Sequence, residues 1–262
     1  MERSFFSKGW CGFGHDPALA GWVSRTLPAA RAAVAAPENA AWRRCHGTWF
    51  AGVNVLPNDA DGAVEGGPKI CGQAVDFIRR TLGQEAIAFD RGQVSVCYPG
   101  YPRQMASESE AGFRYRRDRD AAHLDGLLAE GSERRRRLRE HHGFLLGVPM
   151  VEAAAVAAPF VVWEGSHEII RQTFRACFAG LPPDEWASLD VTDIYHAARR
   201  KIFQRCRRVE IAAGPGEAYL VHRLALHGVA PWSKAAKAGP DGRMVVYFRP
   251  DIGSPEDWLN AP

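Results

Sequence analysis

The sequence predicts one mainly β domain with helices on its outside. Its 262 residues are enough to bury a single sizeable core. From residue 86 onward, short runs of β-forming residues alternate with turns that contain Gly and Pro, which is typical of an antiparallel β fold. The first 85 residues instead carry helix signals. We therefore expect a single domain, 1–262, with a mostly helical N-terminal shell over 1–85 and a β core over 86–250 that contains a helical insert at 165–206.

The N-terminal part contains helix signals in succession. Asp16 before Pro17 predicts a helix N-cap with proline in the first turn, and Pro28 marks the expected start of a second helix. A short strand at 48–50 is expected to lead into a turn-rich loop that ends at Gly67. Apolar spacing then predicts a helix over 70–82 that stops at Gly83.

The remaining chain is expected to be mainly strands, each a short apolar or β-branched run bounded by turn residues. Together these runs favour a closed or sandwiched antiparallel fold. Helices are predicted near 166–178 and 192–206, and an Arg-rich helix is expected to end before His141 and His142. The predicted strands cover 86–89, 93–98, 144–153, 159–163, 208–212, 218–222 and 243–249.

Composition excludes several classes of protein. No apolar run approaches the roughly 18 to 20 residues of a membrane-spanning helix. The N-terminus lacks the pattern of a secretory signal, so we expect a cytoplasmic protein. Six scattered cysteines without a C-x-x-C pair argue against a structural zinc site or a disulfide scaffold. The segment 103–140 holds ten arginines but eight acidic residues, so it predicts a solvated, internally paired surface and no nucleic-acid partner.

Two separated segments contain candidate metal ligands. In His123-Leu124-Asp125, a strand or a tight turn directs the imidazole and the carboxylate to the same side. A third ligand is expected about 100 residues later, where an apolar strand ends in His227-Gly228. Two imidazoles and one carboxylate on one face of an ion leave positions open, which suits non-haem iron(II) and oxygen chemistry. Zinc sites are more often closed or hold a single open position.

A later strand supplies a candidate anion-binding group. Arg243, Val245, Tyr247 and Arg249 share one face of the predicted strand 243–249. Burying an arginine on an apolar strand is unfavourable unless a carboxylate pairs with it. The distal carboxylate of 2-oxoglutarate matches the fork geometry of a guanidinium.

These motifs in this order resemble the phytanoyl-CoA dioxygenase family of iron(II)- and 2-oxoglutarate-dependent oxygenases. The resemblance covers roughly residues 93 to 250 and includes Glu164-Gly165-Ser166-His167 as well as the ligand segments. It implies a double-stranded β-helix, a jelly-roll or cupin-like barrel. It also implies that His227, and not His222, completes the metal site with His123 and Asp125. The sequence departs from the family at Glu164, where proline is usual, and in a longer spacing from His227 to Arg243. That spacing leaves open whether Arg243 or Arg249 grips the co-substrate.

The resemblance implies hydroxylation or oxidation of a small organic molecule. The cofactors would be Fe(II), 2-oxoglutarate as co-substrate and O2, with succinate and carbon dioxide as co-products. Gln93 and Ser95 alternate with Val94 and Val96 ahead of His123, so we expect them to contact the co-substrate. No sequence feature indicates the primary substrate or the oligomeric state.

The walls of the substrate pocket are expected to come from two segments, 48–67 and 98–119. Tyr98 and Trp163 are further candidates for the pocket. His167 either packs structurally at the start of its helix or lines the same pocket. Other aromatic residues, Trp42 and Trp49 among them, are expected in the core.

Three alternatives remain open at this stage. Arg243 and Arg249 also resemble the arginine pair of dealkylation-repair enzymes, which would make the substrate a nucleic acid or a protein. The same barrel could instead be a non-catalytic metal-binding protein. A zinc-dependent hydrolase using the same three ligands would act without oxygen.

Overall fold

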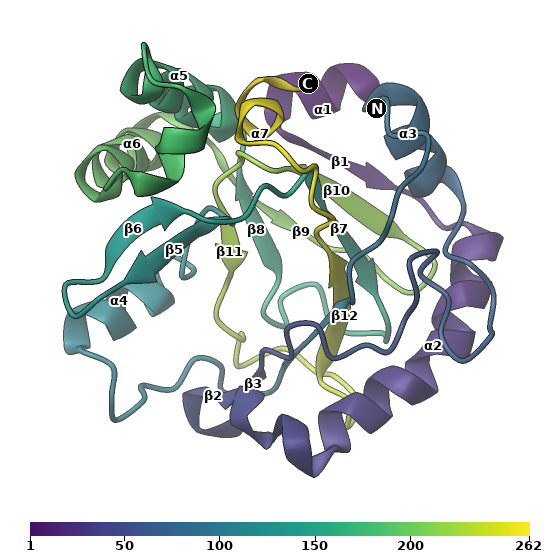
Figure 1. Cartoon of the computed structure of the whole chain (residues 1–262). Helices are drawn as coiled ribbons and strands as arrows, with labels where there is room; N and C mark the ends of the chain where they lie inside the picture. Colours follow the sequence, from purple (N-terminus) through teal and green to yellow (C-terminus); the bar gives the residue numbers. More distant parts are fainter.

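The computed structural model describes all 262 residues and contains two antiparallel sheets (Figure 1). The large sheet has the strand order β1-β10-β7-β12-β4-β3-β2, and the small sheet has the order β11-β8-β9. A separate hairpin pairs β5 with β6. The strands are β1 (Trp10–Phe13), β2 (Arg43–Arg44), β3 (Trp49–Phe50), β4 (Gln93–Cys97), β5 (Leu127–Glu130), β6 (Arg135–Leu138), β7 (Phe144–Pro149), β8 (Phe160–Trp163), β9 (Arg208–Ile211), β10 (Ala218–His222), β11 (His227–Val229) and β12 (Arg243–Phe248).

The path of the chain between the two sheets is that of a jelly roll. A bridge between His123 and His227 adds a further segment beside β11, so the small sheet continues as the His123 segment, β11, β8 and β9. The chain passes from β4 in the large sheet to the His123 segment in the small one, and then back to β7. It then runs through β8 and β9 in the small sheet, β10 in the large, β11 in the small and β12 in the large. This alternation confirms the predicted mainly β class and its jelly-roll arrangement, as two facing sheets.

Apolar side chains pack the two sheets face to face. Alternate residues of each strand point to opposite faces, so a strand such as β10 serves two clusters. Tyr219 and Val221 face the small sheet, where Tyr219 meets Phe160 with ring centroids 5.0 Å apart. Leu220 faces the other way, into the cluster beneath the N-terminal helices. Strands buried on both faces explain why β7, β8, β10 and β12 read as nearly continuous apolar runs.

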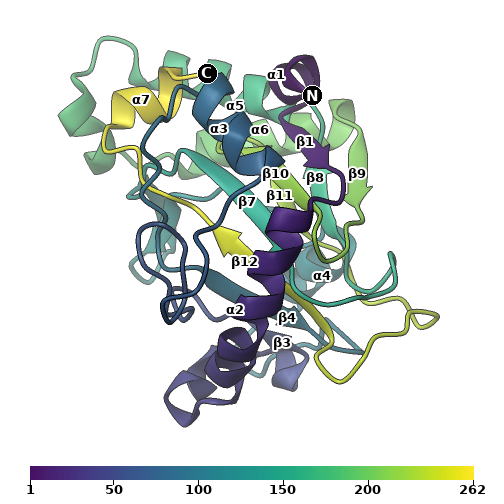
Figure 2. The same ribbon diagram turned by 90° about the vertical axis from the view of Figure 1, so that its right-hand side faces the viewer.

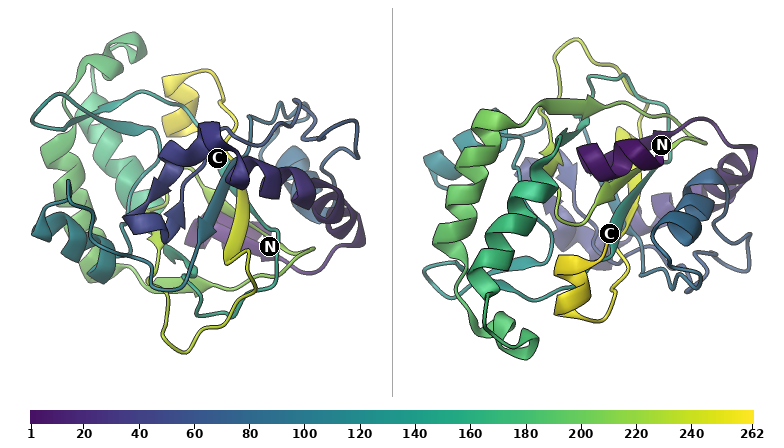
Figure 3. Two further views of the ribbon diagram at one scale, coloured as in Figure 1. Left: turned by 90° about the horizontal axis from the view of Figure 1, so that it is seen from below. Right: turned by 90° about the horizontal axis from the view of Figure 1, so that it is seen from above.

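Helices cover the outer face of each sheet. Apolar residues of α1, α2 and α3 pack on the large sheet, and Figure 2 shows α2 and α3 lying across it. Residues of α5, α6 and α7 pack on the small sheet with Val161 and Trp163. Figure 3 shows the α5–α6 pair on one side and α2 with α3 on the other, with the sheets between them. The helices are α1 (Glu2–Lys8), α2 (Pro17–Ala35), α3 (Gln73–Thr81), α4 (Glu110–Asp118), α5 (Ser166–Phe178), α6 (Thr192–Arg205) and α7 (Pro255–Asn260).

Several local predictions were wrong. Pro28 does not begin a helix but lies inside α2, because an apolar face from Leu19 to Ala33 packs continuously on the sheet. Pro28 is exposed, so the carbonyl that loses its helical partner can bind water. Residues 86–89 form no strand. The Arg-rich segment before His141 is the β5–β6 hairpin rather than a helix, because Arg135 and Arg139 pair with acidic residues across and beyond the turn.

The first 85 residues contribute strands as well as helices. β1 pairs with β10 at one edge of the large sheet, and β2 and β3 extend its other edge from β4. No helix has both the length and the apolar character needed to cross a membrane.

Candidate metal centre

His123 and His227 face each other across a two-residue antiparallel bridge. The His123 amide donates to the His227 carbonyl at 2.8 Å, and the His227 amide donates back at 3.1 Å. Gly228 is what lets the two segments approach so closely, because a Cβ there would lie 2.2 Å from the Asp120 carbonyl oxygen. The backbone pairing brings the two imidazole rings to a centroid distance of 4.6 Å.

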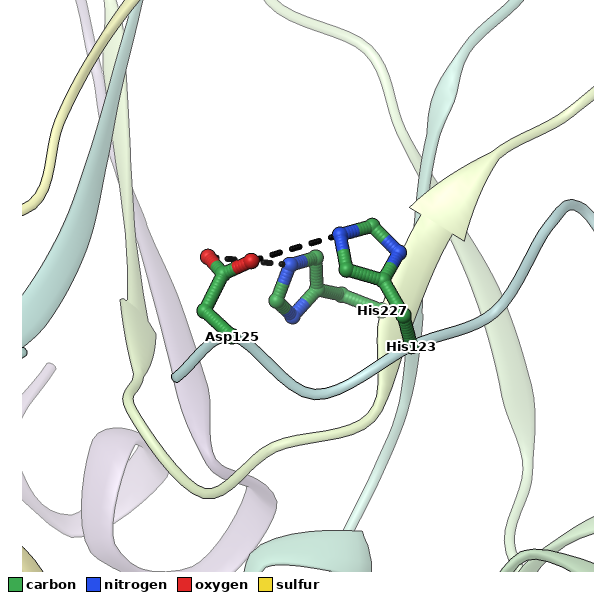
Figure 4. Close-up of side chains that lie close together, drawn as sticks. All are labelled: His123, Asp125 and His227. Atoms are coloured by element: carbon green, nitrogen blue, oxygen red, sulfur yellow. Dashed lines mark ion pairs between the residues drawn. The ribbon is translucent and has the colours of Figure 1, made fainter. Parts of the chain in front are cut away.

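Asp125 completes a group of three potential ligands (Figure 4). Its Oδ1 lies 3.3 Å from His123 Nε2, and its Oδ2 lies 3.5 Å from His227 Nε2. One ligand atom from each residue lies within 4.8 Å of the other two. The carboxylate can be this close because it follows His123 by two residues, before the chain turns at Gly126 with a φ of +85°.

The hydrogen bonds of the two histidines fix their tautomers. His123 Nδ1 lies 3.1 Å from the Ala121 carbonyl, and His227 Nδ1 lies 2.9 Å from the Ala225 carbonyl. Carbonyl oxygens only accept, so each Nδ1 carries the hydrogen and each Nε2 of a neutral ring presents a lone pair. Two lone pairs and a carboxylate therefore face one another, and this arrangement fits a bound divalent cation.

Asp125 is held ionised by its surroundings. Burial opposes its ionisation, but the Arg249 guanidinium outweighs that effect and holds the pKa of the carboxyl well below its usual value. Arg249 Nη1 lies 3.5 Å from Asp125 Oδ2, and its Nη2 donates to Gln93 Oε1 at 2.7 Å. Arg249 and Gln93 thus orient the carboxylate from the side of the large sheet.

The ligand group opens into a cavity of about 560 Å³ between the sheets. This size suits a small organic molecule. Arg249, Gln93 and Ser95, the residues expected to contact the co-substrate, are among those that line it, and Phe160 stacks on His227 at 5.4 Å. A neighbouring cavity of about 780 Å³ shares His123 and Asp125. The residues of the first cavity are Trp42, Arg44, Trp49, Ala51, Val53, Gln93, Ser95, Met105, Ser107, Arg116, His123, Asp125, Arg134, Leu145, Phe160, His227, Gly228, Val229, Tyr247 and Arg249.

Arg243 does not line this cavity but lies beyond Tyr247, where it lines a separate cavity of about 240 Å³ together with Tyr219. The residue is only 9% exposed, and no carboxylate lies within ion-pairing distance of its guanidinium. Its closest polar partners are the hydroxyls of Tyr247, at 3.5 Å, and Tyr219, at 3.4 Å, which bond to each other at 3.0 Å. Burial and the neighbouring Tyr247 raise the pKa of Tyr219 well above its usual value, so its hydroxyl stays neutral. Arg243 is therefore a buried cation without an anionic partner.

Three predicted pocket residues lie outside the cavity. Trp163 alternates with Val162 on β8, so it points outward and packs on Phe203 of α6 at 5.4 Å. His167 starts α5 and bonds to the Phe6 carbonyl at 2.9 Å, which makes it structural. Tyr98 follows the end of β4 and lies beside Arg43. His222 is likewise remote from the ligands, as expected, because its ring bonds to Arg171 at 2.8 Å.

The remaining residues of the cavity were predicted only in part. Both expected wall segments contribute, through Trp49, Ala51 and Val53 and through Met105, Ser107 and Arg116. Trp42 and Trp49 line the cavity although we expected them in the core. Tyr247 shares a strand face with Arg243 and Arg249, and that periodicity was the signal that could have identified it. No pattern in the sequence indicated that Phe160 would line the cavity.

No family model matches the sequence, and no curated protein matches it. Solved structures that it resembles include EctD from S. alaskensis, with 2-oxoglutarate and 5-hydroxyectoine. The likeness covers 94% of this chain and 73% of that one, at 18% identity and a TM-score of 0.48. The likeness to the epimerase SnoN, in complex with Fe3+, alpha ketoglutarate and nogalamycin RO, covers 95% of this chain and 82% of that one, at 16% identity and a TM-score of 0.49. The likeness to AviO1 from Streptomyces viridochromogenes Tue57 covers 100% of this chain and 96% of that one, at 11% identity and a TM-score of 0.42.

Proposed function

We propose that this protein is an iron(II)- and 2-oxoglutarate-dependent oxygenase that oxidises a small organic molecule. The observation that carries the proposal is the convergence of two Nε2 lone pairs and the Asp125 carboxylate beside a cavity. His123, Asp125 and His227 would hold iron on one side and leave its other positions facing the cavity. When bound, iron with 2-oxoglutarate and O2 would supply the oxidising chemistry, and the protein would supply binding and orientation.

Of the two candidate arginines, Arg243 fits the distal carboxylate of 2-oxoglutarate better. Two methylene groups separate that carboxylate from the chelating end of the molecule, so its partner must lie away from the metal. Arg249 contacts the ligand Asp125 directly and already has an anionic partner. Arg243 has none, and the Tyr247 hydroxyl beside it accepts from Tyr219 and so keeps its own hydrogen to donate to a carboxylate.

The remaining residues of the site position groups and exclude water. Arg249 and Gln93 hold the Asp125 carboxylate in place, and the carbonyls of Ala121 and Ala225 fix the two imidazoles. Phe160 and Leu145 form an apolar wall beside His227. A dry wall at this point strengthens the electrostatic interactions at the ligands.

The proposal is tested by measuring iron binding and 2-oxoglutarate consumption together. Equilibrium dialysis should show one iron bound per chain, and this binding should be lost in His227→Ala and Asp125→Ala. His196→Ala is the matched control, because His196 lies on α6 away from the site and should bind iron as wild type. Iron-dependent conversion of 2-oxoglutarate to succinate should consume oxygen and should require Arg243.

Two results would contradict the proposal. Iron binding without any 2-oxoglutarate consumption, and without affinity for 2-oxoglutarate, would favour a non-catalytic metal-binding barrel. Hydrolytic activity with zinc in the absence of oxygen would favour the hydrolase.

A further inference from the structure

The charges around the triad cavity are unevenly distributed. Arg44, Arg116, Arg134 and Arg249 line it, whereas the ligand Asp125 is its only acidic residue. The neighbouring cavity is mixed, because Asp90, Glu140 and Asp251 line it together with Arg134, Arg136 and Arg249. The excess of basic over acidic residues is therefore confined to the triad cavity.

The four arginines differ in whether an acidic side chain forms an ion pair with them. Arg249 pairs with Asp125, and Arg116 pairs with Glu108 at 2.9 Å. Neither Arg44 nor Arg134 has an acidic group within ion-pairing distance, although Arg135, which follows Arg134, pairs with Glu133 at 3.1 Å. Arg44 ends β2, and Arg134 lies in the turn of the β5–β6 hairpin, so the two approach the cavity from different elements (Figure 1). Two arginines without an acidic partner thus line the same cavity.

Aromatic and apolar side chains occupy the same part of the cavity. Trp42 and Trp49 are half-buried there together with Met105. The Arg44 guanidinium lies 5.9 Å from the centre of the Trp42 ring. The Trp49 indole is fixed, because its Nε1 donates to Ser95 Oγ at 3.2 Å. A small molecule with a flat apolar part could contact these rings with that part while its anionic group reaches the arginines.

From this arrangement we infer that the substrate of the proposed oxygenase is a small anion, a carboxylate or a phosphate ester, with a flat or apolar body. Arg44 and Arg134 bind its anionic group at the mouth, and Trp42 and Trp49 contact its body. The inference rests on the proposed function, because 2-oxoglutarate must occupy the part of the cavity between the metal ligands and Tyr247, beyond which Arg243 lies. The volume of about 560 Å³ for both molecules favours a small compound over a polymer.

The test uses the whole protein loaded anaerobically with Fe(II) and 2-oxoglutarate. Binding of 2-naphthoate, 2-naphthyl phosphate and the uncharged 2-naphthamide is measured by equilibrium dialysis, and the visible charge-transfer band is recorded in the same samples. We expect one or both anions to bind better than the amide, with Arg44→Gln and Arg134→Gln each weakening anion binding roughly three- to tenfold. The carboxylate and phosphate arms show which anion is preferred.

Matched controls are available at the adjacent arginines. Arg43→Gln and Arg135→Gln remove the same charge at residues that do not line the cavity, and both should bind the anions as wild type. Equal binding of naphthoate, phosphate and amide, or equal losses in the control variants, would overturn the inference while an intact band leaves the oxygenase proposal standing. Salt-dependent binding of a short single-stranded oligonucleotide in preference to all three compounds would overturn it in favour of a nucleic-acid substrate. Absence of the band would overturn the oxygenase proposal and this inference with it.

Discussion

Gly228→Ala should damage the metal centre without changing any ligand. The added Cβ would lie 2.2 Å from the Asp120 carbonyl oxygen and 3.3 Å from Ala122 Cα, and both are backbone atoms that a side-chain rotation cannot move. The two segments must therefore separate. This separation should break three backbone hydrogen bonds: the one from the Val229 amide to the Asp120 carbonyl, at 2.9 Å, and the reciprocal pair between His123 and His227. At about 1 kcal/mol for each of these three bonds, the free energy of unfolding should fall by about 3 kcal/mol.

Urea unfolding of the metal-free protein measures this loss, and equilibrium dialysis measures iron affinity. Because the two imidazoles move apart with their backbones, iron affinity should fall about tenfold or more. Gly21→Ala is the control, since nothing lies within 4 Å of the added Cβ on helix α2. That variant should be up to about 1 kcal/mol more stable than wild type. Wild-type stability and iron affinity in Gly228→Ala would refute the account of how the ligands are brought together.

Three further predictions concern the elements around the site. Asp16→Ala should lower the free energy of unfolding by about 1 to 2 kcal/mol in urea titrations, because Asp16 accepts from Ala18 at 2.9 Å and Gln73 at 2.8 Å and so caps α2 and α3. The Gln73 amide lowers the pKa of Asp16, so this contribution should be present at neutral pH and lost as pH falls through the lowered value; a constant difference down to the acid limit would contradict it. Burial first, and then Arg223, lower the pKa of His222 well below 6.5, so the unfolded chain takes up the proton first. Wild-type stability should decline as pH falls below about 6.5, and His222→Gln should show a smaller decline; parallel pH profiles of the two proteins would argue against a neutral His222. Phe160→Ala removes a ring that is 2% exposed and stacks on His227, and should lower the free energy of unfolding by about 3 to 5 kcal/mol; a loss under about 1 kcal/mol would show that the ring does not hold the sheets together.

Local sequence signals predicted the elements that depend on local chemistry. The helix at 166–178 was predicted with both of its ends, because its apolar spacing is regular and Gly165 precedes it with a φ of +79°. The strands β4, β8, β10 and β12 were predicted within two residues, because they are buried on both faces and bounded by turns.

Predictions failed where distant contacts decide the local structure. Arg-rich residues such as Arg135 and Arg137 suit a helix equally well, and only their backbone pairing with β5 makes this segment a strand. The run at 86–89 has strand-like composition, but it forms no strand, and Phe89 packs its ring on Phe248 at 5.1 Å. Local propensity could not decide either case.

The candidate ligands were predicted, but most of their surroundings were not. The local spacing of His123 and Asp125 places them together, whereas His227 joins them through the backbone bridge to His123. The orientation of Trp163 depends on strand register, and a shift of one residue reverses the face to which a side chain points. The pairing of Arg249 with Asp125 joins residues more than 100 positions apart in sequence. Only the folded chain shows which arginine is free.

The most direct test of the central claim is an anaerobic titration of Fe(II) and then 2-oxoglutarate into metal-free protein, followed by visible absorption. A charge-transfer band should appear in wild type, be absent in His227→Ala, and require a much higher 2-oxoglutarate concentration in Arg243→Met than in Arg135→Met. No band in wild type, with iron shown by dialysis to be bound, would contradict the assignment of this cavity to 2-oxoglutarate.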